Sequence, residues 1–509
     1  MKKTIYTILF AAATLSMTTS CDEWLDVKPK NEQISTEYWK SKEEVEAVVN
    51  SGYYRLREAV PTLLEWGELR GDAMYSTLTN LAKLQDFTMT SSNTICNYQK
   101  LYQAIAIANS VIKYAPGVQA EDETYADAQM KSHLCEAYFI RAYCYMILVK
   151  NFKEVPLVTE PYVDDSHDFN IAKSTEEQII AQVKKDVEAA LATNSAKSTY
   201  ENDWETKGRA TKWALYAVMA DACLWSEDYD GCIKYCDYIL NADKSGEAFY
   251  PKFLSRTEDW YTMFYPGNSN ESIFELNWDY TTEKKNNNFN TLFPSTGTGT
   301  LNISASLLEK MLTENAIVEA NSSGSERTGR MNLATYAMSN GYILWKYRGN
   351  DVADVEGGLR TSTNQDANFI LYRVAEIILM KAQAEVMTGD ISTALDLDNM
   401  IRVRAGLSAI SDVAKQTYTE ETALDEILEQ KELEFVGEGK RWYDLLWMAR
   451  IGNHKYKNKV IDIVATGNTT TNPDWIKSTL TNDYAWYMPL AESELENNQL
   501  LVQNPYYSK

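Results

Sequence analysis

The chain has 509 residues, of which 45% are hydrophobic, enough for two or three average domains or one large helical domain. Asp and Glu total 72 against 49 for Lys and Arg, which gives a formal net charge of -23 at pH 7. This charge excludes nucleic acid as a general partner, because phosphates would be repelled from most of the surface. It favours neutral ligands over strongly anionic polymers, unless a local basic patch overrides the overall field.

The first twenty residues have the order of a secretory signal peptide. Two lysines precede an apolar stretch over residues 5–15, and small and hydroxylated residues follow as far as Ser20. Cys21 comes next, where acylation would anchor a lipoprotein. We therefore predict a signal peptide over residues 1–20, export and lipidation at Cys21; a soluble secreted protein is the alternative. No other run approaches the ~20 apolar residues needed to span a bilayer.

Apolar residues at helical spacing predict a mostly α-helical chain. We expect helices near residues 42–57, 98–114, 126–150, 175–192, 209–225, 229–240, 369–387, 391–404 and 420–436. Two consecutive pairs, 209–225 with 229–240 and 369–387 with 391–404, have the size of tetratricopeptide hairpins. Gly389 is suited to end the first helix of the second pair. Such hairpins must pack on neighbours to bury their apolar faces, so we predict a scaffold of stacked helical pairs.

The segment over residues 255–300 has no helical period. It is rich in Asn, Gly, Ser, Thr and aromatic residues, and includes the runs KKNNNFN and STGTGT. We predict long irregular loops with a few short strands here. Loops mounted on a rigid scaffold are where binding groups usually lie.

The cysteines and histidines do not predict a metal site or a cofactor. Beyond Cys21 the chain contains Cys96, Cys135, Cys144, Cys223, Cys232 and Cys236, several of them at core-like positions. The last two are four apart on one helix face, but no histidine is near them in sequence, so we interpret all six as buried thiols rather than zinc ligands. The acidic neighbours Asp351, Asp354 and Glu356 do not have EF-hand spacing, and whether a cation binds there stays open.

Charged residues in the predicted helices are interpreted as structural ion pairs. The set is Arg373, Glu376, Glu385, Arg402, Arg404, Glu432, Glu434, Arg441 and Asp444. Glu432 falls on the apolar face that contains Leu428 and Phe435, and Arg141 lies similarly among apolar neighbours; charges at such positions must be paired. The alternative is the acid and base of a glycosidase. Because no Walker loop, His-Glu-x-x-His motif or nucleophile elbow is present, we predict a protein that is not an enzyme.

Five stretches together resemble the SusD/RagB family of nutrient-binding outer-membrane lipoproteins. They are CDEWLDVKP at Cys21, RAYCYMILVKNFKEVPLV from Arg141, ILYRVAEIILMKAQAE from Ile370 with IRVRAGL from Ile401, ELEFVGEGKRWYDLLW from Glu432, and the tail YMPLAESELENNQLLVQNPYY. The third is the most specific. The match runs from Cys21 to the final residues.

The resemblance implies a SusD-like fold in one domain over residues 21–509, with an N-terminal part over about 22–240 and a loop-rich part over about 255–509. It implies an outer-membrane lipoprotein that faces the cell surface, where Asp22 and Glu23 resemble an export signal. The expected ligand is an oligosaccharide or polysaccharide, and the expected partner is a SusC-like TonB-dependent transporter over which the protein sits as a lid. Peptides as cargo, a glycoside hydrolase and a pure interaction scaffold are the alternatives.

Sugars present flat C–H faces and many hydroxyls, so their sites combine exposed aromatic rings with hydrogen-bonding side chains. In the loop segment this pattern selects Trp278, Tyr280, Phe289, Phe293 and Asn290. The family resemblance adds a second region with Trp66, Arg70, Tyr75, Asn97 and Tyr98. Core packing is the alternative for any single ring, since large rings are mostly buried in folded proteins.

Overall fold

The computed structural model describes residues 38–162, 167–282, 285–293, 299–321, 329–338, 341–350, 358–468 and 471–508. The predicted signal peptide, Cys21 and the acidic group at residues 351–356 lie outside these described residues. No helix within the described ranges is long and apolar enough to cross a membrane.

The described chain is mostly α-helical, as the sequence predicts. The helices are α3 (Lys42–Glu68), α4 (Thr79–Gln85), α5 (Gln99–Glu121), α6 (Asp127–Phe152), α7 (Glu176–Ala192), α8 (Asp203–Gly208), α9 (Lys212–Trp225), α10 (Tyr229–Leu240), α11 (Asn287–Leu292), α12 (Ala305–Asn321), α13 (Arg330–Ala334), α14 (Trp345–Arg348), α15 (Val374–Thr388), α16 (Ile391–Arg404), α17 (Asp412–Lys415), α18 (Glu420–Glu434), α19 (Arg441–His454), α20 (Lys457–Gly467), α21 (Pro473–Leu480) and α22 (Glu492–Asn497). Short 3₁₀ segments lie at Thr94–Cys96, Thr257–Met263, Tyr280–Thr282, Asp483–Trp486 and Pro505–Tyr507.

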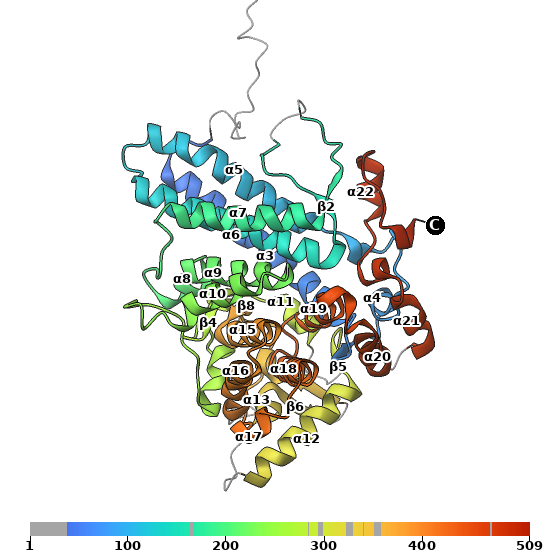
Figure 1. Ribbon diagram of the computed structural model, residues 1–509. Coiled ribbons are helices and arrows are strands. Elements are labelled where there is room, and N and C mark those ends of the chain that lie inside the picture. The colour runs from blue at the N-terminus through green and yellow to red at the C-terminus, as the bar shows by residue number, and fades with distance from the viewer. Residues whose placement is uncertain are drawn as a thin grey trace, which may run out of the picture.

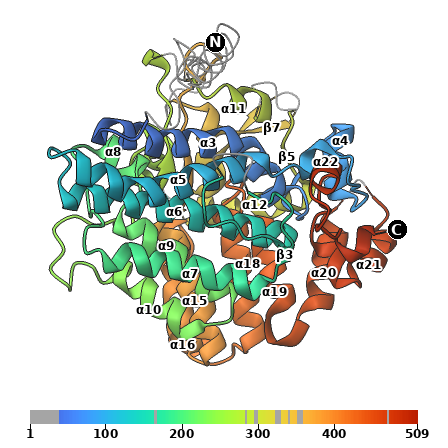
Figure 2. The same ribbon diagram turned by 90° about the horizontal axis from the view of Figure 1, so that it is seen from above.

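Consecutive helices pack in pairs, and the pairs stack. Contacts join α3 to α5, α6 to α7, α9 to α10 and α15 to α16, and α10 and α15 join the two predicted hairpins to each other. Figure 1 shows α3, α5, α6 and α7 in one layer, α9 and α10 beneath it, and α15, α16 and α18 beneath those. The C-terminal helices α20 to α22 gather at one end beside α4, in this view and in the view from above in Figure 2.

Local sequence sets where the hairpin helices begin and end. The side chains of Asp228 and Asp390 accept backbone N–H groups at the starts of α10 and α16, which are the second helices of the two predicted hairpins. Gly389 has φ of 93° and ends α15 in the left-handed conformation, which confirms the predicted helix stop. Three predicted boundaries were wrong. α3 continues through Pro61 to residue 68, and α5 continues through Pro116 to residue 121. The first five residues of the predicted helix 369–387 form a strand.

The strands are short and pair in four two-stranded antiparallel sheets: β1 (Met74–Tyr75) with β5 (Asn302–Ile303), β2 (Val155–Pro156) with β3 (Lys173–Ser174), β4 (Ser272–Leu276) with β8 (Phe369–Arg373), and β6 (Thr335–Met338) with β7 (Gly341–Leu344). The β4 and β8 pair is buried and ties the loop segment to the start of α15. The described residues of 255–300 therefore contain loops, the one strand β4, two 3₁₀ segments and the six-residue helix α11, where the sequence predicts loops with a few short strands.

The charged residues of the predicted cluster are paired, which confirms their structural interpretation. Buried Glu434 accepts Arg373 Nη1 at 2.7 Å and Arg404 Nη2 at 2.8 Å, and Arg441 Nη2 lies 2.8 Å from Glu432. Lys440 pairs with Glu376 at 2.5 Å, Lys381 lies 3.7 Å from Glu385, and Arg402 and Asp444 pair with Glu426 and Lys431. Arg141 likewise binds Asp186 at 2.6 Å and 2.8 Å. Most of these pairs join different elements of the fold, whereas Lys381 and Glu385 lie on the same helix, α15.

The six cysteines of the described chain are buried free thiols, as predicted. Cys232 and Cys236 lie with their sulfurs 4.0 Å apart inside α10. The described residues contain no group of three or more His, Cys, Asp or Glu side chains placed to hold a metal ion.

Candidate functional site

A groove of about 480 Å³ lies beside α3, and we call it the α3 groove. Its lining residues are Pro61, Thr62, Glu65, Leu78, Asn80, Leu81, Thr94, Ile95, Asn288, Thr291, Leu292 and Thr300. It joins the two parts of the chain in which the sequence predicts ligand contacts, the region around residues 66–98 and the loop segment ending at residue 300.

Backbone pairing brings these two parts together. In the β1 and β5 pair, Tyr75 lies opposite Asn302, and Asn302 Nδ2 donates to the Tyr75 carbonyl at 3.3 Å. The Leu301 N–H donates to the Leu292 carbonyl at 3.0 Å, which ties α11 to the same strand. The groove is therefore built on paired backbone rather than on free loops, which favours a preformed binding surface.

The groove wall is rich in neutral hydrogen-bonding groups. Thr62 comes from α3, and Asn288 and Thr291 come from α11. Asn80 comes from α4 and Thr94 from the 3₁₀ segment Thr94–Cys96, both after β1. Asn80 Nδ2 donates to Thr94 Oγ1 at 3.2 Å, so these two side chains hold each other in place. Hydroxyls and amides both donate and accept hydrogen bonds, which suits them to the hydroxyls of a neutral sugar.

Glu65 is the acidic group of the described groove lining. Its carboxyl is partly buried, and no described cation lies within ion-pair distance of it. Burial raises the pKa of Glu65 from 4.5 to about 7, because the charged form loses solvent without gaining a partner. The Glu65 carboxyl therefore changes its ionisation near neutral pH. The ionised form only accepts hydrogen bonds from the hydroxyls of a ligand, and the protonated form can also donate one.

Glu65 gives the groove an expected pH dependence. A carboxyl with a pKa of about 7 goes from roughly one tenth ionised at pH 6 to nine tenths at pH 8. The ionised form accepts stronger, charge-assisted hydrogen bonds from sugar hydroxyls, so we expect the Kd of a bound oligosaccharide to fall by up to about tenfold over this range. Calorimetric titration at both pH values checks this. Glu65→Gln should flatten the profile, and a flat profile in the unmodified chain would contradict the role of Glu65.

The same face of α3 continues beyond the groove. Tyr54, Arg57 and Pro61 follow one another at helical spacing, and Tyr54 is 49% exposed. The Arg57 guanidinium lies 5.6 Å from the Tyr54 ring and 5.7 Å from the Trp278 ring, and its Nη1 donates to the Asn277 carbonyl at 2.9 Å. An exposed ring and a fixed guanidinium thus extend the groove along the helix.

Six of the ten predicted ligand contacts are buried, and all of these except Trp278 are at most 3% exposed. Trp66, Arg70, Tyr98, Phe289 and Phe293 are buried, and fully covered side chains cannot present a face to a sugar, so we remove them from the candidate site. Trp66 donates through Nε1 to the Ile95 carbonyl at 2.7 Å, and the Arg70 guanidinium lies 4.7 Å from the Trp442 ring. These contacts support the groove from below.

The other rings of this set pack on each other. Tyr98 packs against Phe152 at 5.2 Å between ring centroids. Phe289 and Phe293 pack on Tyr347 at 4.6 Å and 5.1 Å. Core packing, the alternative named for each ring, is therefore the role that the structure gives them.

The remaining predicted contacts reach the surface to different degrees. Tyr280 is 43% exposed, Asn97 is exposed and Tyr75 is half-buried. Trp278 is only 7% exposed, with Arg57 over its ring, and Asn290 accepts Arg348 Nη1 through Oδ1. For these five residues ligand contact stays a prediction.

Sequence reasoning missed most of the groove lining. Thr62, Glu65, Asn80 and Thr291 are small or acidic residues without an aromatic signal, so the search for exposed rings passed over them. A helical-face reading of α3 would have found Tyr54 and Arg57 on the side opposite the apolar residues. The true length of α3 was the missing information.

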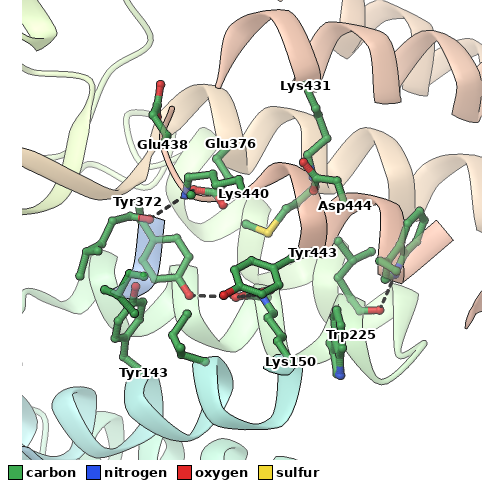
Figure 3. Close-up of a pocket in the computed structure, with 18 of the residues that line it drawn as sticks. Tyr143, Lys150, Trp225, Tyr372, Glu376, Lys431, Glu438, Lys440, Tyr443 and Asp444 are labelled. Carbon is green, nitrogen blue, oxygen red and sulfur yellow. Dashed lines mark hydrogen bonds and ion pairs between the residues drawn. The ribbon is translucent and has the colours of Figure 1, made fainter. Parts of the chain in front are cut away.

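A second cavity, shown in Figure 3, has a volume of about 60 Å³. Lys150 contacts both Asp221 oxygens at 2.7 Å, Tyr372 donates to Asp221 at 2.9 Å, and Lys440 pairs with Glu376 at 2.5 Å. Because its charged side chains pair with one another in this way, we assign this cavity to the buried ion-pair core.

Known proteins match the chain over nearly its whole length. The sequence profile of the SusD family matches residues 176–507, and a profile described as starch-binding associating with outer membrane matches residues 23–224. The chain belongs to the SusD family. The family and the fold class predicted from the sequence are therefore confirmed.

Individual members of the SusD family are distant in sequence. SusD-like protein P38 of Formosa agariphila is 24% identical over 520 residues, which cover 92% of this chain and 95% of the relative. Surface glycan-binding protein A from Bacteroides uniformis has a TM-score of 0.69 at 21% identity, covering 92% of this chain and 100% of that one. A laminarin-binding SusD-like protein has a TM-score of 0.66 at 20% identity, covering 92% and 99%. At such identities these structures show the shared fold.

Proposed function

We propose that this protein is a cell-surface lipoprotein that captures an oligosaccharide or polysaccharide in the α3 groove and delivers it to a SusC-like TonB-dependent transporter. The observation that carries the proposal is the groove itself, which combines hydroxyl and amide side chains from two distant parts of a SusD family chain. Two neighbours in fold are named for glycan binding, one of them for laminarin.

The proposed role is non-catalytic. Glycoside hydrolysis generally needs two carboxyl groups about 5 to 10 Å apart across the scissile bond. Among the described residues that line the groove, Glu65 is the one carboxyl group, so it lacks an acid or base partner in that wall. Binding without turnover is the chemistry that this lining supports.

Delivery needs a membrane anchor and a partner transporter, and the family description supports location at the outer membrane. The profile that covers residues 23–224 describes association with the outer membrane. Acylation at Cys21 would tether the folded region through the residues that precede α3, on the cell-surface side. The transporter would then lie beneath the helical scaffold, with the protein as its lid.

Calorimetric titration of the mature chain without lipid, against a panel of neutral plant and host oligosaccharides, tests the capture function. We expect saturable heat with one glycan class and no continuing heat from turnover. Saturable binding of peptides alone would move the cargo to the peptide class, and steady heat with sugar release would overturn the non-catalytic role. No saturable heat with any glycan would overturn glycan capture.

Cys21→Ala is expected to release the protein from the membrane. The substitution removes the thiol that would be acylated, so the export signal alone would remain. We expect the variant to move from the detergent-soluble membrane fraction to the soluble fraction, measured by fractionation and immunoblotting in a host that processes lipoproteins. Cys96→Ala, which changes a buried thiol, is the control that should stay in the membrane. Membrane retention of Cys21→Ala would contradict lipid anchoring.

A further inference from the structure

A separate pocket of about 140 Å³ lies where α8, the start of α9 and the chain after α10 meet, and we call it the α9 pocket. Its wall includes Lys207 from α8, Thr211 at the start of α9, and Phe249, Tyr250 and Lys252. None of these residues lines the α3 groove.

The helix start in this pocket lacks its usual cap. Thr211 occupies the N-cap position of the 14-residue helix α9 with extended backbone angles, but its side chain accepts no hydrogen bond from the first turn. Thr211 is 1% exposed, and its Oγ1 has no hydrogen-bond partner among the described residues. A Thr at this position normally satisfies one of the free N–H groups. The Lys212 N–H donates to the Lys197 carbonyl at 2.8 Å, so the Thr211 hydroxyl and the next N–H groups of the first turn are left to a ligand.

Two ammonium groups share the pocket. Lys207 Nζ donates to the Ser272 carbonyl at 2.7 Å and keeps two further N–H groups, while Lys252 Nζ lies 4.7 Å from the Tyr250 ring. Neither lysine has a carboxylate within ion-pair distance in the described chain, whereas neighbouring Lys212 pairs with Glu247 at 2.5 Å. The lining also contains one carboxylate, Asp203, so the two lysines leave a local excess of positive charge in a chain of net charge -23.

The charge on Lys207 is incompletely balanced. Burial lowers its pKa from 10.5 to about 8, and the more distant carboxyls of Glu275 and Asp203 oppose that shift only in part. An anion bound beside Lys207 would restore the lost stabilisation of the charged amine. The lining also contains Phe249, which is 60% exposed, and the hydroxyl groups of Ser198 and Thr206, of which the second already accepts the Tyr200 N–H at 2.9 Å. An exposed ring with hydroxyl neighbours suits a sugar ring better than a bare inorganic anion.

We propose that the α9 pocket binds an acidic saccharide unit, with its carboxylate at the N-terminus of α9 between Lys207 and Lys252 and its ring against Phe249. This second site is distinct from the α3 groove and takes a different class of sugar. It would let the protein hold an acidic branch of a glycan whose neutral part occupies another surface.

Saturation-transfer-difference NMR with the intact mature chain tests the second site, using glucuronate and galacturonate against glucose and galactose. We expect saturable transfer to at least one uronate and none to its neutral counterpart. Lys252→Glu should weaken uronate binding at least about tenfold, because it places a like charge beside the carboxylate. Lys234→Glu is the matched control, since Lys234 is also exposed and lies 5.5 Å from the ring of Tyr235, outside the pocket.

The outcomes separate the two sites. Thr62→Trp, which fills the α3 groove, should leave uronate binding unchanged, so failure of either site is seen independently. Uronate binding should also weaken as pH rises through 8 and Lys207 loses its proton. The proposal would be overturned by equal transfer to neutral sugars or by no transfer to either uronate. It would also be overturned if Lys252→Glu bound uronate as the unmodified chain does. If inorganic sulfate alone displaces the uronate and no contact to the sugar ring is detected, the pocket is a general anion site. That result would overturn the saccharide assignment.

Discussion

Glu434→Gln is expected to lower the free energy of unfolding by about 3–5 kcal/mol, the range for removing one partner of a buried ion pair. Glu434 is fully buried and accepts Arg373 at 2.7 Å, Arg404 at 2.8 Å and Trp260 Nε1 at 2.8 Å. The amide keeps the shape and an acceptor but removes one carboxylate charge that Arg373 and Arg404 share, and these guanidinium groups then rely on Glu271 and Glu438 alone. Guanidinium chloride unfolding followed by circular dichroism measures the loss.

The same carboxylate gives the fold an acid-sensitive contribution. The Arg404 and Arg373 charges lower the pKa of Glu434 from 4.5 to about 2, against the effect of burial. The pKa is lower in the folded state, so the stabilisation is fully present above pH 4.5 and is lost as pH falls towards 2. We expect the stability difference between the unmodified chain and Glu434→Gln to shrink over that window.

Glu258→Gln is the matched control for Glu434→Gln. Glu258 also pairs with an arginine, Arg256, but both side chains are exposed to solvent. Surface ion pairs contribute little, because water and salt screen them and both side chains lose freedom. We expect no measurable change in the unfolding midpoint. An equally small effect of Glu434→Gln would contradict the structural importance of the buried network.

Patterns with a local physical cause were predictable from the sequence. The two hairpins, their short turns of three and two residues, and the stop at Gly389 follow from periodicity, side-chain caps and a left-handed glycine. The strand at Phe369–Arg373 was not predictable in this way, because its apolar residues continue the pattern of α15. Pairing with β4, about a hundred residues earlier in the chain, decides its conformation.

The candidate site was predictable as a meeting of two regions but not as a set of contacts. Aromatic residues mark both regions, yet composition cannot tell a ring that packs from a ring that is exposed. Trp66 and Glu65 are neighbours on α3, and the turn of the helix puts the first in the core and the second in the groove. Which face of α3 stays exposed depends on the side chains that α5, β5 and α11 cover. This is decided by the tertiary structure and not by the local sequence.

Thr62→Trp is expected to abolish glycan capture, with a loss of affinity of about 100-fold or more, or roughly 2.7 kcal/mol. Thr62 lies on α3 in the wall of the groove, between Pro61 and Glu65. An indole there occupies the space of a bound sugar ring, while α3 keeps its buried face unchanged. Calorimetric titration with the glycan identified for the unmodified chain measures the change.

Two further variants separate occlusion from a fault in folding. Thr62→Val keeps the size of the side chain and removes one hydroxyl, so it should weaken binding by no more than about tenfold, the range of a single hydrogen bond. Lys113→Trp adds an indole at an exposed position of α5 outside the groove and should bind as the unmodified chain does. Unchanged binding by Thr62→Trp would place the glycan elsewhere, first at Trp278, which lies next to Arg57, and at Tyr280, which is exposed.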